Sequence, residues 1–154
     1  MALAEVTEYF KGFGMEDKIL LFDESTATVE RAAERLNVIP ARIAKTLSFR
    51  SGNGCILVVV AGDKKIDNAK FKGKFSMKAK MLTPDEVIAM VGHPVGGVCP
   101  FALPRNVAVY LDASMQRFES VFPACGSANS AIELTCAELQ KYSEAEEWVD
   151  VCKG

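Results

Sequence analysis

Histidine is almost missing from this chain, because His93 is the single histidine among 154 residues. The five cysteines lie far apart and form no C-x-x-C pair. Zinc sites mostly need several cysteine or histidine ligands at short spacings. We therefore expect no metal and no cofactor. A disulfide framework is not expected either, since a chain of this length can bury enough apolar surface without one.

Long apolar runs are missing as well. The run from Ile56 to Ala61 is far shorter than the roughly 20 residues that span a bilayer. The N-terminal segment carries acidic residues where a signal peptide would need a basic start. We therefore expect no membrane association and a cytoplasmic location. With 49% apolar and 25% charged residues, positions 1–154 are expected to form one compact domain.

Several motifs that carry chemistry are absent. Neither G-x-x-x-x-G-K-[ST] nor G-x-G-x-x-G occurs, so a nucleotide-type phosphate loop is not expected. The G-x-S-x-G turn that presents a serine nucleophile is also missing. Any activity must therefore use other groups.

Charge is unevenly distributed along the chain, although the formal net charge is only -2. Residues 63–80 contain seven lysines and two aspartates, whereas residues 133–150 contain six acidic residues and one lysine. We therefore expect one basic and one acidic edge, with a local polyanion contact at the basic one. The alternative is a solvated, lysine-rich face.

Hydrophobic periodicity and capping residues predict an α+β fold with a mixed sheet and short flanking helices. Thr28, Thr83 and Thr135 each precede a helical pattern as N-cap residues. Helices are expected at residues 3–10, 28–36, 83–92 and 135–142, and strands at residues 19–22, 44–50, 55–62, 107–111, 122–126 and 131–135.

One predicted strand carries a lysine on its apolar face. The period of two places Lys45 beside Leu47 and Phe49, with Thr46 on the opposite face. At the entry of the strand, this lysine could reach into a cleft. The alternative is a lysine whose stem packs on Leu47 while its ammonium group stays in water.

Residues 92–101 read GHPVGGVCPF and allow three interpretations. The segment could be a tight structural turn, or a site where Cys99 is a nucleophile and His93 its base. Pro94 and Pro100 stiffen the loop and argue against the nucleophile. The third interpretation is a cradle whose backbone N–H groups grip a carbonyl or an oxyanion. The residues alone leave the turn and the cradle open.

Three segments together resemble the YbaK family, which includes the editing domain of bacterial prolyl-tRNA synthetase. They are IAKTLSF, GGVCPFALP and GSANSAIELT, at residues 43–49, 96–104 and 126–135. In that family a strand lysine followed by a small polar residue matches Lys45 and Thr46. The family's G-x-x-x-P loop starts at Gly96, and its later glycine turn matches Gly126.

The resemblance implies a deacylase that acts in trans on mischarged tRNA and hydrolyses the ester to the terminal adenosine. It implies that the substrate's own ribose hydroxyl helps position water, and that Lys45 holds the terminal phosphate. Mischarged aminoacyl-tRNA and prolyl-tRNA synthetase are the implied partners, and Lys70, Lys72 and Lys74 are predicted to contact tRNA phosphates. The implied substrate-binding residues are Thr46, Gly96, Gly97, Val98, Cys99, Pro100 and Gly126.

The amino acid that would be removed stays open. Around Gly126 this sequence has ACGSANS, where the best-known branch of the family has a serine, an arginine and a second glycine. Cysteine, alanine, serine and threonine are therefore all candidates. A competing interpretation is a catalytically silent relative that binds a tRNA end or a synthetase.

Overall fold

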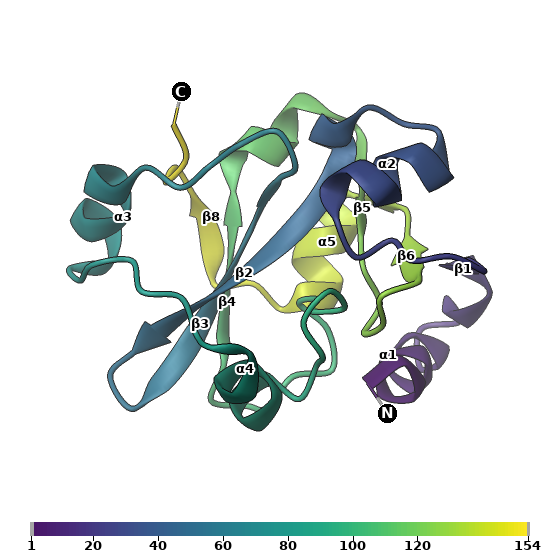
Figure 1. Cartoon of the computed structure of the whole chain (residues 1–154), viewed down its shortest axis with the longest axis horizontal. Coiled ribbons are helices and arrows are strands. Elements are labelled where there is room, and N and C mark those ends of the chain that lie inside the picture. Colours follow the sequence, from purple (N-terminus) through teal and green to yellow (C-terminus); the bar gives the residue numbers. More distant parts are fainter. Residues whose placement is uncertain (1, 154) are drawn as a thin grey trace.

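The computed structural model describes residues 2–153, which form a six-stranded mixed sheet and a two-stranded sheet beside it (Figure 1). The large sheet has the order β7-β5-β2-β3-β4-β8. Its β2–β3 and β5–β7 pairs are antiparallel, whereas β2–β5, β3–β4 and β4–β8 are parallel. The predicted α+β class is thereby confirmed. The strands are β1 (Ile19–Leu21), β2 (Ile43–Ser51), β3 (Gly54–Ala61), β4 (Ala108–Asp112), β5 (Ser120–Pro123), β6 (Ser130–Ile132), β7 (Leu134–Thr135) and β8 (Glu147–Val149).

Short helices flank the sheets, and their starts follow the predicted caps. The side chains of Thr28, Thr83 and Thr135 each accept a backbone N–H from the first turn, which satisfies a group that the helix itself cannot pair. None of the described helices is long and apolar enough to cross a membrane. The helices are α1 (Ala2–Lys11), α2 (Val29–Leu36), α3 (Asn68–Phe75), α4 (Pro84–Val91) and α5 (Cys136–Ser143), with short 3-10 turns at Glu16–Lys18, Pro40–Arg42 and Ala113–Arg117.

The sheet is buried on both faces of its central strand. All residues of β3 from Cys55 to Ala61 are buried, as their continuous apolar run predicts. Leu57 and Val59 join the larger core, while Val58 and Val60 face the smaller core under α3. Residues 51–54 read SGNG, which is typical of a turn between two strands, and they form a hairpin with Ser51 opposite Gly54.

Two elements were not predicted from the sequence. Helix α3 has a glycine in its middle and no clear apolar stripe, yet Asp67 caps it and Phe71 is fully buried beneath it. Strand β8 is three residues long and begins with an acidic residue. Both form because of tertiary packing, which a local pattern does not record.

The predicted separation into a basic and an acidic edge is wrong, because α3 and β8 lie next to each other at one end of the sheet (Figure 1). The Lys70 Nζ atom lies 3.1 Å from the Asp150 carboxylate. The Lys74 Nζ atom lies 2.6 Å from the Glu147 carboxylate. Lysines from one charged run therefore neutralise carboxylates from the other.

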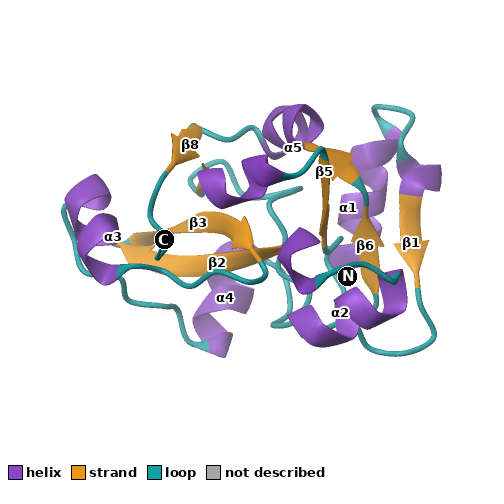
Figure 2. Ribbon diagram, turned by 90° about the horizontal axis from the view of Figure 1, so that it is seen from above, coloured by secondary structure: helices purple, strands orange, loops and turns teal. Residues whose placement is uncertain are grey.

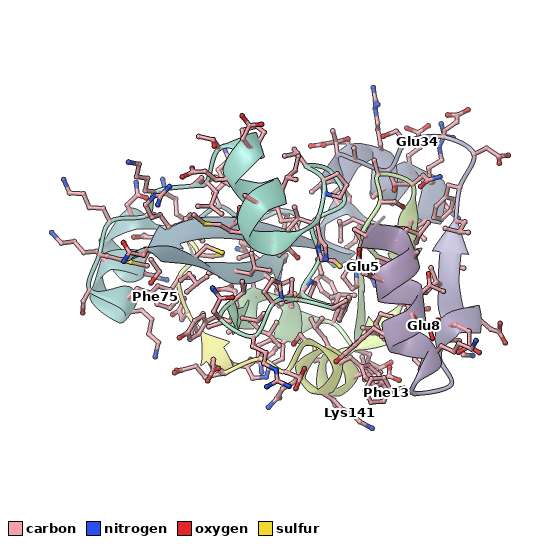
Figure 3. The ribbon with its side chains drawn as sticks, turned by 90° about the horizontal axis from the view of Figure 1, so that it is seen from below. Glu5, Glu8, Phe13, Glu34, Phe75 and Lys141 are labelled. Atoms are coloured by element: carbon pink, nitrogen blue, oxygen red, sulfur yellow. The ribbon has the colours of Figure 1, made fainter. Side chains whose placement is uncertain are left out.

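At the opposite end, the start of the chain packs beside the segment between β5 and β6 (Figure 2). Strand β1 pairs antiparallel with β6. The N–H of Thr26 donates to the carbonyl of Ala128 at 2.6 Å, which holds residues 26–28 against this segment. Just after the end of α1, Phe13 lies beside Lys141 of α5, with the ammonium 6.0 Å from the ring centroid (Figure 3).

Candidate functional site

A cavity of about 280 Å³ opens between the start of β2, helix α2 and helix α4. Three loops complete its wall, namely residues 26–28, residues 95–98 and the segment that runs from β5 into β6. Apolar side chains dominate the wall, and exposed Met81 and Val95 stand at its rim. The hydroxyl groups in the wall come from Thr26, Thr28, Thr46, Ser48 and Ser130.

Thr46 supplies the wall with an unused polar atom. Its Oγ1 is buried and has no hydrogen-bond partner among the described residues. Ser130 differs, because its Oγ accepts the N–H of Cys125 at 3.1 Å and the hydroxyl of Ser127 at 2.9 Å. Leaving a buried hydroxyl unpaired costs about 1–3 kcal/mol. Thr46 is therefore the wall position where a ligand's polar group would be most favourable.

Lys45 lines the same cavity and is partly buried at the entry of β2. Burial lowers the pKa of its ammonium group. Cys152 opposes that change, while the positive charge of Lys65 adds to it. The carboxylates of Glu30 and Asp63 also act to raise this pKa, so Lys45 is within electrostatic range of α2 and of the turn that follows β3.

The backbone N–H groups of the loop after α4 fall into two kinds: some are unpaired at the cavity in the described chain, and one closes a turn within the loop. Gly96 and Val98 line the cavity, and within residues 2–153 their N–H groups have no hydrogen-bond partner. The N–H of Gly97 instead donates to the carbonyl of Pro94 at 2.9 Å, which closes a tight turn. The loop thus contains a tight turn that uses the Gly97 N–H, and the N–H groups of Gly96 and Val98 are the ones left for a cradle.

Gly97 has a packing role instead. It does not line the cavity, and a Cβ atom added to it would lie 2.6 Å from the Ser127 nitrogen. Gly126 is packed just as closely against α1, because a Cβ on Gly126 would lie 2.8 Å from the carbonyl carbon of Ala2. Gly126 also has a φ of +92°, which disfavours other residues. Gly97 and Gly126 therefore support the backbone behind the cavity, and their contact with a substrate stays a prediction.

Cys99 and Pro100 lie behind the cavity wall. Cys99 is completely buried, and burial raises the pKa of its thiol to about 12. The Nδ1 atom of His93 accepts the backbone N–H of Cys99 at 3.2 Å and is 3.7 Å from its sulfur. A buried neutral thiol is a poor nucleophile. Cys99 and Pro100 are both buried and do not line the cavity, and their contact with a substrate stays a prediction.

Other wall residues were not found from the sequence. Thr26 and Ala27 enter the wall because residues 26–28 are bonded to Ala128, and no local pattern marks that contact. Thr28 was expected only as a helix cap. No group of three or more potential metal ligands occurs in the part of the chain that the structure describes.

Residues 23–142 match the family model of the aminoacyl-tRNA editing domain. The chain belongs to the aminoacyl-tRNA editing domain family. The resemblance stated from three short segments is confirmed, and the cavity lies within the matched range. This editing domain is similar to a solved structure of a proposed trans-editing enzyme for prolyl-tRNA synthetase, with a TM-score of 0.89 and 25% identity. That match covers 99% of this chain and 98% of the other.

The editing domain also has curated relatives. It is 53% identical over 154 residues to the uncharacterized protein YwhH of Bacillus subtilis, covering 99% of this chain and 98% of the relative. It is 27% identical over 115 residues to EbsC of Enterococcus faecalis, a proposed Cys-tRNA(Pro)/Cys-tRNA(Cys) deacylase, covering 73% and 70%. A proline-tRNA ligase of Thermotoga maritima is 26% identical over 125 residues, which are 80% of this chain but 21% of the ligase.

Replacing Gly97 by alanine should destabilise the protein, because the new methyl group meets the backbone at Ser127. We expect the free energy of unfolding to fall by about 1–3 kcal/mol, as for other overpacked sites. Gly73→Ala is the matched control, since nothing lies within 4 Å of its Cβ position on α3. That control should be neutral or slightly stabilising. Urea unfolding measures both, and equal midpoints for the two variants would contradict the packing role.

The buried Cys99 thiol should react with an alkylating reagent at least about tenfold more slowly than Cys136, which is partly exposed. Peptide mass spectrometry on the native protein gives both rates in one sample. Cys99→Ser should fold and keep most of any hydrolytic activity. Rapid alkylation of Cys99, with a dead Cys99→Ser variant, would restore the cysteine nucleophile.

Proposed function

We propose that this protein is a trans-acting deacylase that hydrolyses the ester bond of mischarged aminoacyl-tRNA. The observation that carries the proposal is the buried, unpartnered Oγ1 of Thr46 in the wall of a cavity that lies within an editing domain. An apolar cavity with one unused hydroxyl and two unused backbone donors suits a small, polar, activated group. In a cavity that binds nothing, these polar groups would stay unpaired and would only cost stability.

The reaction needs little from the protein, because an aminoacyl ester is already activated. In our proposal, the N–H groups of Gly96 and Val98 donate to the ester carbonyl oxygen and stabilise the charge that develops there. Water adds to the carbonyl carbon, the ester C–O bond breaks, and the released ribose oxygen takes up a proton from the water. The cavity holds the ester and the water close together, and this positioning supplies the larger part of the rate increase. No protein nucleophile is required.

Thr46 and Lys45 are assigned to substrate positioning. The Thr46 Oγ1 atom offers a hydrogen bond to a polar group of the bound aminoacyl end, and the Lys45 ammonium offers a positive charge to the terminal phosphate. Both residues line the cavity, on consecutive positions of β2. Their side chains leave the strand in opposite directions, so they can hold different parts of one ligand.

We propose cysteine, alanine, serine or threonine as the amino acid, and tRNA-Pro as the carrier. We base this on a cavity of about 280 Å³ whose wall includes the small side chains of Ala44, Ala124 and Ala131. A synthetase gains only about 1–3 kcal/mol from one methylene, so similar and smaller amino acids escape its selection. Relatives within proline-tRNA ligases support prolyl-tRNA synthetase as the enzyme whose errors are removed.

Thr46→Val should lower kcat/KM for the preferred mischarged tRNA about 2- to 15-fold, the effect of losing one neutral hydrogen bond. Lys45→Ala should reduce turnover more strongly or abolish it, because a charged contact is lost. Matched controls are Thr7→Val on α1 and Lys18→Ala, both outside the cavity. The assay follows tRNA-Pro charged with each candidate amino acid and with proline. Tight binding without hydrolysis of any of them would support the silent binding module instead.

We propose that the tRNA phosphates contact the turn after β3 rather than the lysines of α3. Lys70 and Lys74 are engaged by Asp150 and Glu147, whereas Lys72 stays exposed on the same distant helix. No described carboxylate forms an ion pair with Lys64 or Lys65, and the neighbouring Asp63 is engaged by Arg117 at 2.7 Å.

Salt dependence distinguishes the two paths. A Lys64→Glu, Lys65→Glu variant should reduce the slope of log K against log salt by about one unit for each lost phosphate contact. A Lys70→Glu, Lys74→Glu variant is the matched control and should change the slope little. The opposite ranking of the two variants would return the tRNA to α3.

A further inference from the structure

We propose that His93 is a positioning residue that holds the loop of residues 94–98 in its substrate-binding shape only while its imidazole is neutral. The catalytic part of this inference rests on the proposed deacylase function. The conformational part does not, and it can be tested without any substrate.

His93 closes the loop from inside the protein. It is 2% exposed, and its Nδ1 atom accepts the N–H of Cys99, six residues later, at 3.2 Å. Within the loop closed by this hydrogen bond, the N–H of Gly97 donates to the carbonyl of Pro94 and forms a turn. Gly96 lies inside this turn and Val98 lies between the turn and Cys99, and both carry N–H groups that face the cavity in the proposed function. The imidazole therefore fixes the end of the segment that carries both donors.

The hydrogen bond specifies one protonation state. Nδ1 can accept only when it carries no proton, so the ring is neutral with its hydrogen on Nε2. In the imidazolium form both nitrogens carry hydrogens. The Nδ1–H group would then face the N–H of Cys99, donor against donor. Protonation therefore removes the bond that closes the loop.

The surroundings favour the neutral ring. Burial lowers the pKa of His93, which outweighs the opposing effects of Glu5 and of the backbone groups of Cys99 and Phe101. Glu5 is an exposed residue of α1, labelled in Figure 3, and its negative charge acts to raise the pKa of His93. The thiol of Cys99, with its pKa raised to about 12, stays uncharged. Because the folded-state pKa lies below the unfolded value of about 6.5, this contribution to stability is complete above that pH and is lost as the pH falls.

Two substitutions test separately whether residue 93 must accept a hydrogen bond and whether its protonation causes the loss of activity. His93→Asn places an amide oxygen close to the position of Nδ1 but cannot be protonated in this range, whereas His93→Leu removes the acceptor. At pH 7.5 the asparagine variant should keep hydrolysis within about threefold of wild type, and the leucine variant should lose about tenfold or more. The ratio of wild-type to asparagine-variant kcat/KM cancels the pH dependence of the ester and of Lys45. That ratio should be constant above pH 7 and fall about tenfold per pH unit below the folded-state pKa.

Backbone amide NMR of the protein without substrate gives the independent test. The Gly96, Val98 and Cys99 signals should shift together with the His93 titration in wild type and stay constant in His93→Asn. If no aminoacyl-tRNA is hydrolysed, these shifts still decide the conformational claim, and only the deacylase proposal fails. Stationary loop signals during the His93 titration, a pH-independent activity ratio, or full activity of His93→Leu would each overturn the positioning role.

Discussion

The cavity depends on how closely three backbone segments approach one another. A Cβ on Gly97 would lie 2.6 Å from the Ser127 nitrogen, and a Cβ on Gly126 would lie 2.8 Å from Ala2. Helix α1, the turn after β5 and the loop after α4 are therefore stacked without side chains between them. Side chains at these positions would push the loop outward and carry the Gly96 and Val98 donors away from β2. The glycines act by allowing this approach.

Features set by neighbouring residues were predictable from the sequence. Threonine caps, the apolar run of β3 and the hairpin after β2 each depend on groups within a few positions of one another, and each is present. Helix α3 depends instead on burying Phe71 against β2 and against residues near the C-terminus. The Phe49 ring lies tilted against the Phe71 ring, with 4.7 Å between the centroids. Nothing in its own eight residues records that contact, so the sequence alone could not predict it.

The candidate site was predictable only in part, for a related reason. Family motifs marked Lys45, Thr46, Gly96 and Val98, which line the cavity. They also marked Cys99 and Gly126, which hold the loop from behind. A motif cannot separate a residue that contacts a ligand from one that shapes the backbone, because a substitution at either position alters the same site. Only the burial and the direction of each group distinguish them.

Charge gives the clearest case of sequence order misleading about space. Lysines of α3 and carboxylates near β8 are separated by about half of the chain, yet they neutralise each other in the fold. Among residues 2–153, Lys45 and the lysines of the turn after β3 form no ion pair, so their positive charge stays available beside the cavity. Because the whole chain carries -2, the proposed tRNA substrate gains no long-range attraction from the net charge of the protein. In the proposed function, a small basic area at the cavity edge then favours contact with a single-stranded end of the substrate, because a thin, flexible segment can bring its phosphates close to that area.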